Sequence, residues 1–563
     1  MSIVVEKPGY ALEVSDDGLR ATLSPAGDEP WLTLRPHAAF DTVDGLDETV
    51  AVSAPQLVEG RIVIERRSTL WERAAVTIEC TETQVELRAT VSGHGRLAGA
   101  DLLALRSLLP DRPTGLLPSG YAVGRVTKLF CPNPAHATGI RPVYEPAVNG
   151  VTGDGEPGRH HWFFTPAPLY LAWAEEDERE WLDLGILAPV DELTFVEAGY
   201  APRDGGFHLR LEYEGHTEVD GEFAAPSLVF TAGAPDPASG LRRHREDLAA
   251  RGAAPAVAER ERPRWWSEPI FCGWGAQFHL FETSGVSPMA QATQANYDRF
   301  LATLEREGLR PGTVVLDDKW QKAYGTNEPD AAKWPDLKSW IAGRHEEGRR
   351  VLLWWKAWDP EGLPPELCIR NPDGVPVAVD PSNPRTRERV ARQVRALLSP
   401  EGVDADGLKV DFTARTPSGR NLEAHGEGWG IALLHNLLGV VYRAAKEAKP
   451  DALVITQTPH PAFADVADMI RLNDMIGGHE SVVPQMTFRA EVARAALPEL
   501  LIDTDDWRIP SRDAWREYLS IKHELGVPSL YYATHVDMTG EPLEPEDYKA
   551  LQEAWERWEA LRS

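Results

Sequence analysis

Carboxylates, basic residues and tryptophans recur together at six points in the C-terminal half of the sequence. Each group ends a short apolar run, and the six are Gly273-Trp274-Gly275, Asp317-Asp318-Lys319-Trp320, Trp354-Trp355-Lys356, Lys409-Val410-Asp411, Arg471-Leu472-Asn473-Asp474 and Asp503-Thr504-Asp505-Asp506-Trp507. Two carboxylates can cleave a glycosidic bond when one attacks the anomeric carbon and the other protonates the leaving oxygen. Tryptophan faces cover the apolar side of a sugar ring, and the chain has 19 of them. These residue types favour chemistry on a carbohydrate.

Each motif also has an ordinary structural explanation. Asp317 and Asp318 could cap a helix, and the acids from Asp503 to Asp506 could form a solvated loop or a divalent-cation site. Lys409 and Asp411 share one face of a strand and could be a structural ion pair. We favour the functional interpretation because a separate structural explanation would have to hold independently at the end of each of several successive strands.

The elements that position these motifs are predicted from the apolar pattern after residue 265. Short apolar runs alternate there with amphipathic segments, which is typical of parallel βα units. The eight predicted strands are 270–274, 313–316, 351–355, 407–410, 452–456, 469–472, 500–502 and 529–533. We predict a (β/α)₈ TIM barrel, whose active sites form at the C-terminal strand ends. A doubly wound sheet is the competing prediction, but no GxGxxG or P-loop follows any of these strands.

The N-terminal half has a different period. Apolar and polar residues alternate over 76–80 and 85–91, with a predicted turn at 81–84, and the alternation returns over 207–213. A short helix is expected over 238–249. We therefore predict an α/β chain with an N-terminal β-sandwich domain over 1–250, a linker over 251–264 and the barrel over 265–563.

Composition narrows the classes of partner. The formal net charge is −29, from 87 acidic and 58 basic residues, which disfavours binding to nucleic acid or to an anionic membrane surface. Cys80, Cys131, Cys272 and Cys368 form no CxxC pattern, so neither a zinc site nor a disulfide framework is expected. The N-terminus lacks a signal-peptide pattern, and no apolar run is long enough to span a membrane. We expect a cytoplasmic, reduced protein; the sequence leaves a homo-oligomer open.

At these motifs the chain resembles glycoside hydrolase clan D, which contains the α-galactosidases of families 27 and 36 and the raffinose synthases. The second barrel strand of that clan ends in an Asp pair followed closely by Trp, as Asp317-Asp318-Lys319-Trp320 does. Its fourth strand carries a Lys-x-Asp, similar to Lys409-Val410-Asp411, and its sixth an Arg-x-x-Asp, similar to Arg471-Leu472-Asn473-Asp474. The β-sandwich before the barrel is the family 36 arrangement. The chain departs from the clan at Lys319, where Gly is usual, and it ends on the last barrel helix, so no C-terminal β domain is expected.

The resemblance implies a retaining α-glycoside hydrolase of the α-galactosidase type. Asp411 would be the nucleophile and Asp474 the acid/base. Asp317 and Asp318 would bind the far hydroxyls of the terminal sugar. An α-linked oligosaccharide or glycoside is the expected partner, and no metal or organic cofactor is expected.

The remaining residues would complete the sugar pocket. By the same resemblance, Lys409 and Arg471 would bind hydroxyls nearer the reacting carbon. Trp274, Trp320 and Trp355 would shape the pocket walls.

Three other functions stay open. An α-galactosyl transglycosylase of the raffinose-synthase kind shares the first half-reaction. A non-catalytic carbohydrate-binding barrel would lack one carboxylate, whereas both are present. A metal-dependent barrel hydrolase could use Asp503, Asp505 and Asp506, but the histidine ligands usual at an early strand end are missing from the sequence. Asp505 or Asp506 is also a rival to Asp474 as the acid.

Overall fold

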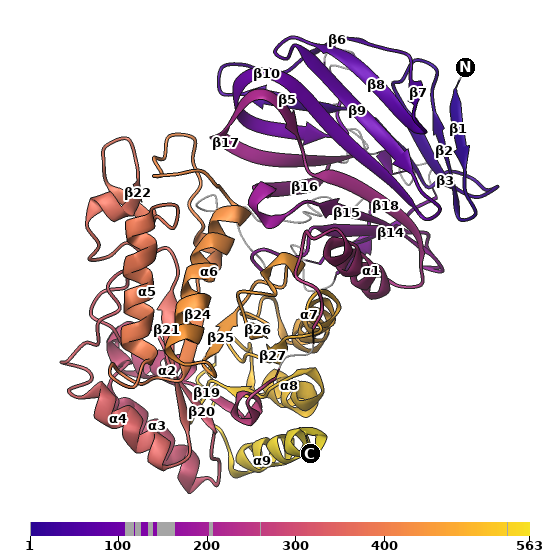
Figure 1. Cartoon of the computed structure of the whole chain (residues 1–563). Helices are drawn as coiled ribbons and strands as arrows, with labels where there is room; N and C mark the ends of the chain where they lie inside the picture. The colour runs from indigo at the N-terminus through magenta and orange to yellow at the C-terminus, as the bar shows by residue number, and fades with distance from the viewer. Residues whose placement is uncertain are drawn as a thin grey trace.

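The computed structural model describes residues 2–106, 117–118, 125–132, 139–143, 164–201, 206–258, 261–536 and 539–562. An antiparallel β domain forms one end of the molecule and a barrel surrounded by helices forms the other (Figure 1). The predicted fold class, a β-sandwich followed by a (β/α)₈ barrel, is confirmed. The exact boundaries at 250 and 265 stay predictions.

The N-terminal domain contains two antiparallel sheets, one of five strands and one of thirteen, within the described ranges. The predicted turn at 81–84 is present, since the N–H of Thr81 donates to the carbonyl of Gln84 at 2.9 Å. The smaller sheet has the order β1 (Ile3–Glu6), β2 (Tyr10–Val14), β3 (Ala21–Pro25), β4 (Leu32–Leu34) and β11 (Leu117–Pro118). The larger sheet contains β5 (Ala38–Thr42), β6 (Thr49–Val52), β7 (Gln56–Val58), β8 (Arg61–Ser68), β9 (Arg73–Cys80), β10 (Gln84–Leu102), β12 (Lys128–Phe130), β13 (Ile140–Pro142), β14 (Tyr170–Ala174), β15 (Trp181–Leu187), β16 (Phe195–Ala201), β17 (Gly206–Ala224) and β18 (Ser227–Ala234).

The barrel is a parallel sheet whose strands follow chain order. Its members are β19 (Ile270–Cys272), β20 (Thr313–Leu316), β21 (Arg350–Lys356), β24 (Gly407–Asp411), β25 (Leu453–Thr456), β26 (Met469–Arg471), β27 (Leu501–Asp503) and β28 (Ser529–Leu530). β28 pairs with β19, and the N–H of Val527 donates to the carbonyl of Ile502 at 2.7 Å, which closes the ring beside β27. All eight predicted strands are present. They are largely buried on both faces, as parallel strands covered by helices must be.

Helices cover the outside of the barrel. They are α2 (Trp274–Ser284), α3 (Gln294–Arg306), α4 (Leu337–Glu346), α5 (Pro384–Leu398), α6 (Ile431–Ala448), α7 (Val482–Ala496), α8 (Arg512–Leu525) and α9 (Pro545–Arg562). α5 shows how the sequence sets a boundary: Asn383 caps the helix by accepting the N–H of Arg385, and proline occupies the first turn. A short hairpin of β22 (Cys368–Arg370) and β23 (Pro376–Val379) precedes α5.

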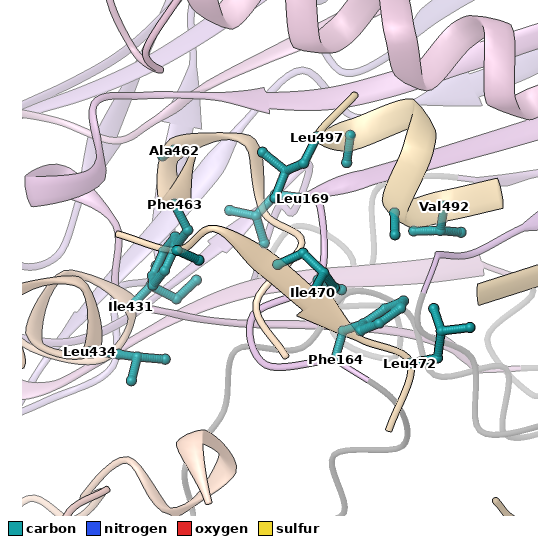
Figure 2. Close-up of a cluster of buried hydrophobic side chains, with 14 of the residues drawn as sticks. Phe164, Leu169, Ile431, Leu434, Ala462, Phe463, Ile470, Leu472, Val492 and Leu497 are labelled. Atoms are coloured by element: carbon teal, nitrogen blue, oxygen red, sulfur yellow. The ribbon is translucent and has the colours of Figure 1, made fainter. Parts of the chain in front are cut away.

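The fifth βα unit differs from the others. Between β25 and β26, where every residue is described, the chain forms only the short 3₁₀ helix η6 (Pro461–Phe463). The N-terminal domain packs there instead, through the predicted short helix, α1 (Pro237–Ala250), and through Phe164 and Leu169. Figure 2 shows these two side chains against Phe463 and Ile470 of the barrel.

No helix within the described ranges is long and apolar enough to cross a membrane.

Candidate active site

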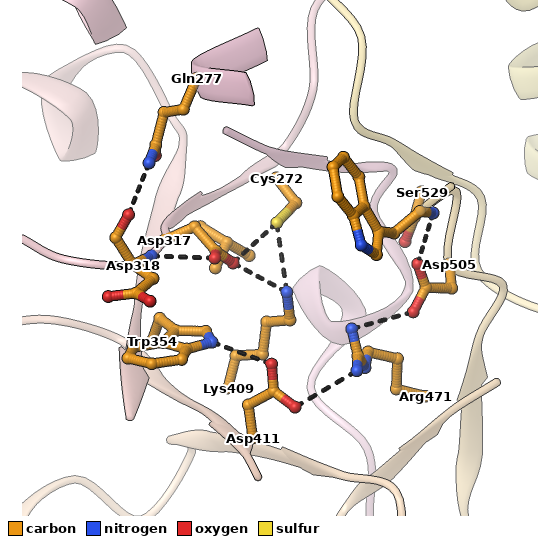
Figure 3. A network of polar contacts seen from close by, with 12 residues as sticks. Cys272, Gln277, Asp317, Asp318, Trp354, Lys409, Asp411, Arg471, Asp505 and Ser529 are labelled. Atoms are coloured by element: carbon orange, nitrogen blue, oxygen red, sulfur yellow. Dashed lines mark hydrogen bonds and ion pairs between the residues drawn. The ribbon is translucent and has the colours of Figure 1, made fainter. Parts of the chain in front are cut away.

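Strand β24 directs Asp411 into the mouth of the barrel. Lys409 and Asp411 pair in register with Trp354 and Lys356 of β21, so these four side chains share the inner face of the sheet. The indole Nε1 of Trp354 donates to Asp411 Oδ2 at 3.1 Å, and the N–H of Phe412 donates to Oδ1 at 2.8 Å. Phe412 has φ of +61°, a left-handed conformation unusual for a bulky residue, which turns the chain directly after the carboxylate. These two hydrogen bonds orient Asp411, and Figure 3 shows the one from Trp354 together with the contact of Asp411 with Arg471.

Arg471, at the end of β26, lies between three carboxylates. Its NH2 nitrogen is 3.3 Å from Asp411 Oδ1 and 3.5 Å from Asp474 Oδ1. The two Oδ1 atoms are thus at most about 7 Å apart, a limit that includes the spacing of about 5–5.5 Å in retaining glycosidases. The other nitrogen, NH1, is 3.1 Å from Asp505 Oδ2.

The two candidate catalytic carboxyls have pKa values displaced in opposite directions. Burial acts to raise the pKa of Asp411, but the charges of Arg471 and Lys409 outweigh it and hold the pKa below its ordinary value. Desolvation raises the pKa of Asp474 to about 6; Arg471 opposes this shift, and the negative charges of Asp505 and Asp411 add to it. The side chain of Asp474 keeps 49% of its exposure, so it can still meet a substrate. Near pH 5 the pair holds one ionised and one protonated carboxyl.

The turn that carries Asp474 is stabilised by hydrogen bonds from neighbouring buried side chains. Asn473 has φ of +68°, and its side-chain oxygen accepts from Arg471 NH2 at 2.6 Å. Arg489 of α7 is fully buried and donates from NH1 to the carbonyls of Leu472, Asn473 and Asp474, at 2.7, 2.7 and 2.9 Å. Gln457, after β25, accepts from Arg471 NH2 at 3.0 Å. Arg489 could not be recognised from the sequence, because it lies 15 to 17 residues beyond the three carbonyls that it binds.

The floor of the site is a compact ionic cluster. Lys409 Nζ lies 2.8 Å from Asp317 Oδ2 and 3.3 Å from the sulfur of Cys272. The Cys272 thiol donates to the same oxygen of Asp317 at 3.0 Å, and its pKa is raised well above the ordinary value, first by burial and then by Asp317. In the sequence, Cys272 is only an isolated cysteine. Its place beside Lys409, 137 residues further along the chain, depends on the barrel, which brings β19 and β24 to one interior.

Asp318 lies next to this cluster, and its N–H donates to Asp317 Oδ1 at 2.9 Å. Tyr324 donates its hydroxyl to Asp318 Oδ1 at 2.7 Å, and its ring carries the ammonium groups of Lys319 and Lys356, each 4.1 Å from the ring centroid. Burial raises the pKa of Asp318 to about 7, with the Tyr324 hydrogen bond opposing the shift. Lys319, where the clan usually has Gly, is paired with Glu361 at 2.7 Å.

The strand 7 acids have separate partners. Asp506 is fully buried, 3.0 Å from Lys522 Nζ, and it accepts from the indole of Trp515 at 3.2 Å. Asp503 is buried, and its Oδ1 accepts from the Ser529 hydroxyl and from the N–H of Asp505. Of these three acids, Asp505 is the one paired with Arg471, which also contacts Asp411 and Asp474. Among the residues that the structure describes, no three His, Cys, Asp or Glu side chains are grouped as metal ligands would be.

The predicted tryptophans occupy three different places. Trp274 is half-buried and packs edge-on against Trp507, with ring centroids 5.7 Å apart, beside the turn that carries Asp505. Trp320 is fully buried, and its indole N–H donates to the carbonyl of Trp354 at 2.7 Å, so it stabilises β21 and does not face the site. Trp355 pairs in register with Val410, on the outer face of the sheet, whereas its neighbour Trp354 faces Asp411. Six of the predicted site residues lie together in the structure: Asp317, Asp318, Lys409, Asp411, Arg471 and Asp474.

No family model and no curated protein matches this chain. Solved structures do. An α-galactosidase from Thermus thermophilus in complex with stachyose is 15% identical, with 89% of this chain and 98% of that chain covered and a TM-score of 0.53. A GH31 family sulfoquinovosidase from E. rectale, in complex with an aza-sugar inhibitor, is 11% identical, with coverage of 99% and 82% and a TM-score of 0.58. A cycloalternan-degrading enzyme from Trueperella pyogenes, in complex with a covalent intermediate, is 13% identical, with coverage of 92% and 72% and a TM-score of 0.51. At these identities the likeness shows that the chain shares their fold.

Proposed function

We propose that this protein is a retaining α-glycoside hydrolase of the α-galactosidase type, with Asp411 as nucleophile and Asp474 as acid/base. The observation that carries the proposal is the shared contact of both carboxyls with Arg471 NH2, together with their opposite pKa shifts. A double displacement needs this combination of an ionised attacking group and a protonated donor at close range. The glycosidases of the same fold support the proposal.

The reaction follows from the positions of these groups. Asp411 attacks the anomeric carbon from one face while Asp474 gives its proton to the leaving oxygen, which produces a β-linked glycosyl-enzyme from an α-linked substrate. Asp474, now ionised, then removes a proton from water, and the water displaces Asp411 to release the α-sugar. Arg471 and the Trp354 indole hold Asp411 in the orientation required for attack.

Galactose is the proposed terminal sugar. Asp317, Asp318 and Lys409 line the floor, where they can bind the hydroxyls of a ring seated over Asp411. The Asp pair resembles the galactose-binding motif of clan D, and the Thermus thermophilus neighbour is an α-galactosidase in complex with stachyose. Trp274, which packs against Trp507, is the residue to which we assign the apolar wall of the sugar site.

A screen of aryl α-glycosides tests the proposal. The panel contains nitrophenyl α-galactoside, α-glucoside, α-N-acetylgalactosaminide and β-L-arabinopyranoside, and the α-galactoside is expected to be hydrolysed fastest. Asp411→Asn keeps the size of the side chain but removes the attacking charge, so kcat should fall by roughly 10³-fold or more. Azide supplied to this variant should yield β-glycosyl azide, because a small anion attacks from the face that the carboxylate used. Hydrolysis at a near-normal rate by Asp411→Asn would overturn the mechanism.

A further inference from the structure

Asp505 has a position that the proposed double displacement does not by itself require. It lies in the turn after β27, it is fully buried, and its Oδ2 is 3.1 Å from Arg471 NH1. We propose that Asp505 is a positioning residue for catalysis: it anchors Arg471 so that the guanidinium stays between Asp411 and Asp474. This inference rests on the proposed function.

The carboxylate of Asp505 is fixed by its own turn. Its Oδ1 accepts the N–H of Asp506 at 2.6 Å and that of Trp507 at 2.9 Å, and the residue has φ of +53°. Left-handed backbone at a residue other than glycine costs energy and recurs at functional sites. Since Oδ1 is held by the turn, Oδ2 faces Arg471 in one fixed direction (Figure 3).

Arg471 needs such an anchor because one of its nitrogens is shared. NH2 lies within 3.5 Å of oxygens of Asp411, Gln457, Asn473 and Asp474, whereas NH1 faces Asp505. A planar guanidinium held at NH1 presents NH2 to both catalytic carboxylates in a defined geometry. Without that hold, the guanidinium could rotate toward one carboxylate and leave the other.

The negative charge of Asp505 changes the pKa of Asp474 in a known direction. This charge raises the pKa of Asp474 and offsets the positive charge of Arg471. If Asp505 becomes neutral, Arg471 acts on Asp411 and Asp474 alone, and the pKa of Asp474 falls. Because Asp474 must be protonated in the first step, activity would then be lost at a lower pH than in the wild type.

The test compares pH profiles of kcat/KM for Asp505→Asn, Asp506→Asn, Arg471→Lys and the double variant Asp505→Asn/Arg471→Lys. The substrate is a disaccharide α-glycoside of the sugar identified in the screen (melibiose if it is galactose). Asp506→Asn is the matched control, since Asp506 is equally buried on the same turn but pairs with Lys522. Circular dichroism checks that each variant is folded, and Asp505→Ser replaces Asp505→Asn if the latter does not fold.

We expect the alkaline limb of the wild type near pH 6 to move down by about one unit in Asp505→Asn. Its kcat should fall about 10- to 100-fold with little change in KM, because Asp505 is fully buried behind Arg471. Asp506→Asn should keep the wild-type limb. The double variant should be no slower than Arg471→Lys, since Asp505 acts through that residue.

An unchanged alkaline limb in Asp505→Asn, or losses that multiply in the double variant, would overturn the inference. Those outcomes leave the proposed function intact if the wild type hydrolyses the substrate and Asp411→Asn does not. A wild type without hydrolytic activity, or an active Asp411→Asn, refutes the proposed function itself.

Discussion

At the scale of single residues, the surroundings of Asp411 and Asp474 differ in ways that suit different tasks. Asp411 receives donors from Trp354, Phe412 and Arg471, and its carboxyl cannot rotate without breaking them. Asp474 is half-exposed and has its ion pair with Arg471 at the longer distance of 3.5 Å. A nucleophile benefits from fixed aim, whereas an acid/base must reach first a leaving oxygen and then a water.

Removal of Asp474 should affect substrates according to their leaving groups. A nitrophenol departs with little protonation, whereas a sugar alcohol requires it. In Asp474→Ala, kcat/KM, which reports the formation of the glycosyl-enzyme, should therefore fall by about 10²- to 10⁴-fold on a disaccharide. On a nitrophenyl glycoside it should fall much less. Asp506→Ala is the control, because Asp506 pairs with Lys522 and should weaken both substrates alike. If the leaving-group contrast appears in Asp506→Ala, the acid belongs to strand 7.

At the scale of elements, the loop over 412–430, which follows Asp411 of β24, is held against the N-terminal domain. Glu214 of β17 accepts from the Ser418 hydroxyl at 2.5 Å, from the N–H of Gly419 at 2.8 Å and from the indole of Trp429 at 2.7 Å. His216 stacks on the Trp429 ring with centroids 3.5 Å apart. One carboxylate thus holds both the middle and the end of the loop that begins after Asp411.

Removal of Glu214 should loosen this loop. Hydrogen bonds to a charged group each contribute about 1.5–3 kcal/mol, so Glu214→Ala should raise amide hydrogen exchange over 412–430 and lower kcat several-fold. Glu218→Ala is the matched control, since Glu218 lies exposed on the same strand. Hydrogen exchange followed by mass spectrometry reads the loop directly. If amide hydrogen exchange over 412–430 is unchanged in Glu214→Ala, the barrel alone orders this loop.

The barrel strands could be predicted from the sequence because each is a short apolar run, and most of these runs end in a motif with charged residues. The convergence of Asp317, Lys409, Asp411 and Arg471 then follows from the closure of the barrel. The choice between Trp354 and Trp355 could not be made, because it depends on the register of β21 against β24. Contacts across long separations, such as Glu214 with Trp429, leave no local pattern in the sequence.

At the scale of the whole molecule, the N-terminal domain takes the place of the missing fifth helix. Arg245 of α1 is paired with Glu499, which precedes β27, at 2.8 Å, and the two side chains are only 1% and 2% exposed. Apolar side chains from both parts of the chain also form the continuous cluster in Figure 2. Strands β25 and β26 lie next to this interface; Gln457 directly follows β25, and Arg471 is the last residue of β26.

The buried pair gives a test of this coupling. Arg245→Met leaves the Glu499 carboxylate buried without its partner, which should lower the free energy of unfolding by about 3–5 kcal/mol. Calorimetry should show a lower thermal midpoint, and activity should be lost at a correspondingly lower temperature, since the interface supports the strands of the site. Arg242→Met is the control: Arg242 is exposed on the same helix, and its change should stay within about 0.5 kcal/mol. Arg245→Met/Glu499→Met should recover most of the loss, because apolar residues can replace a buried ion pair. If Arg245→Met melts and loses activity at the wild-type temperature, the ion pair does not couple the two parts of the chain.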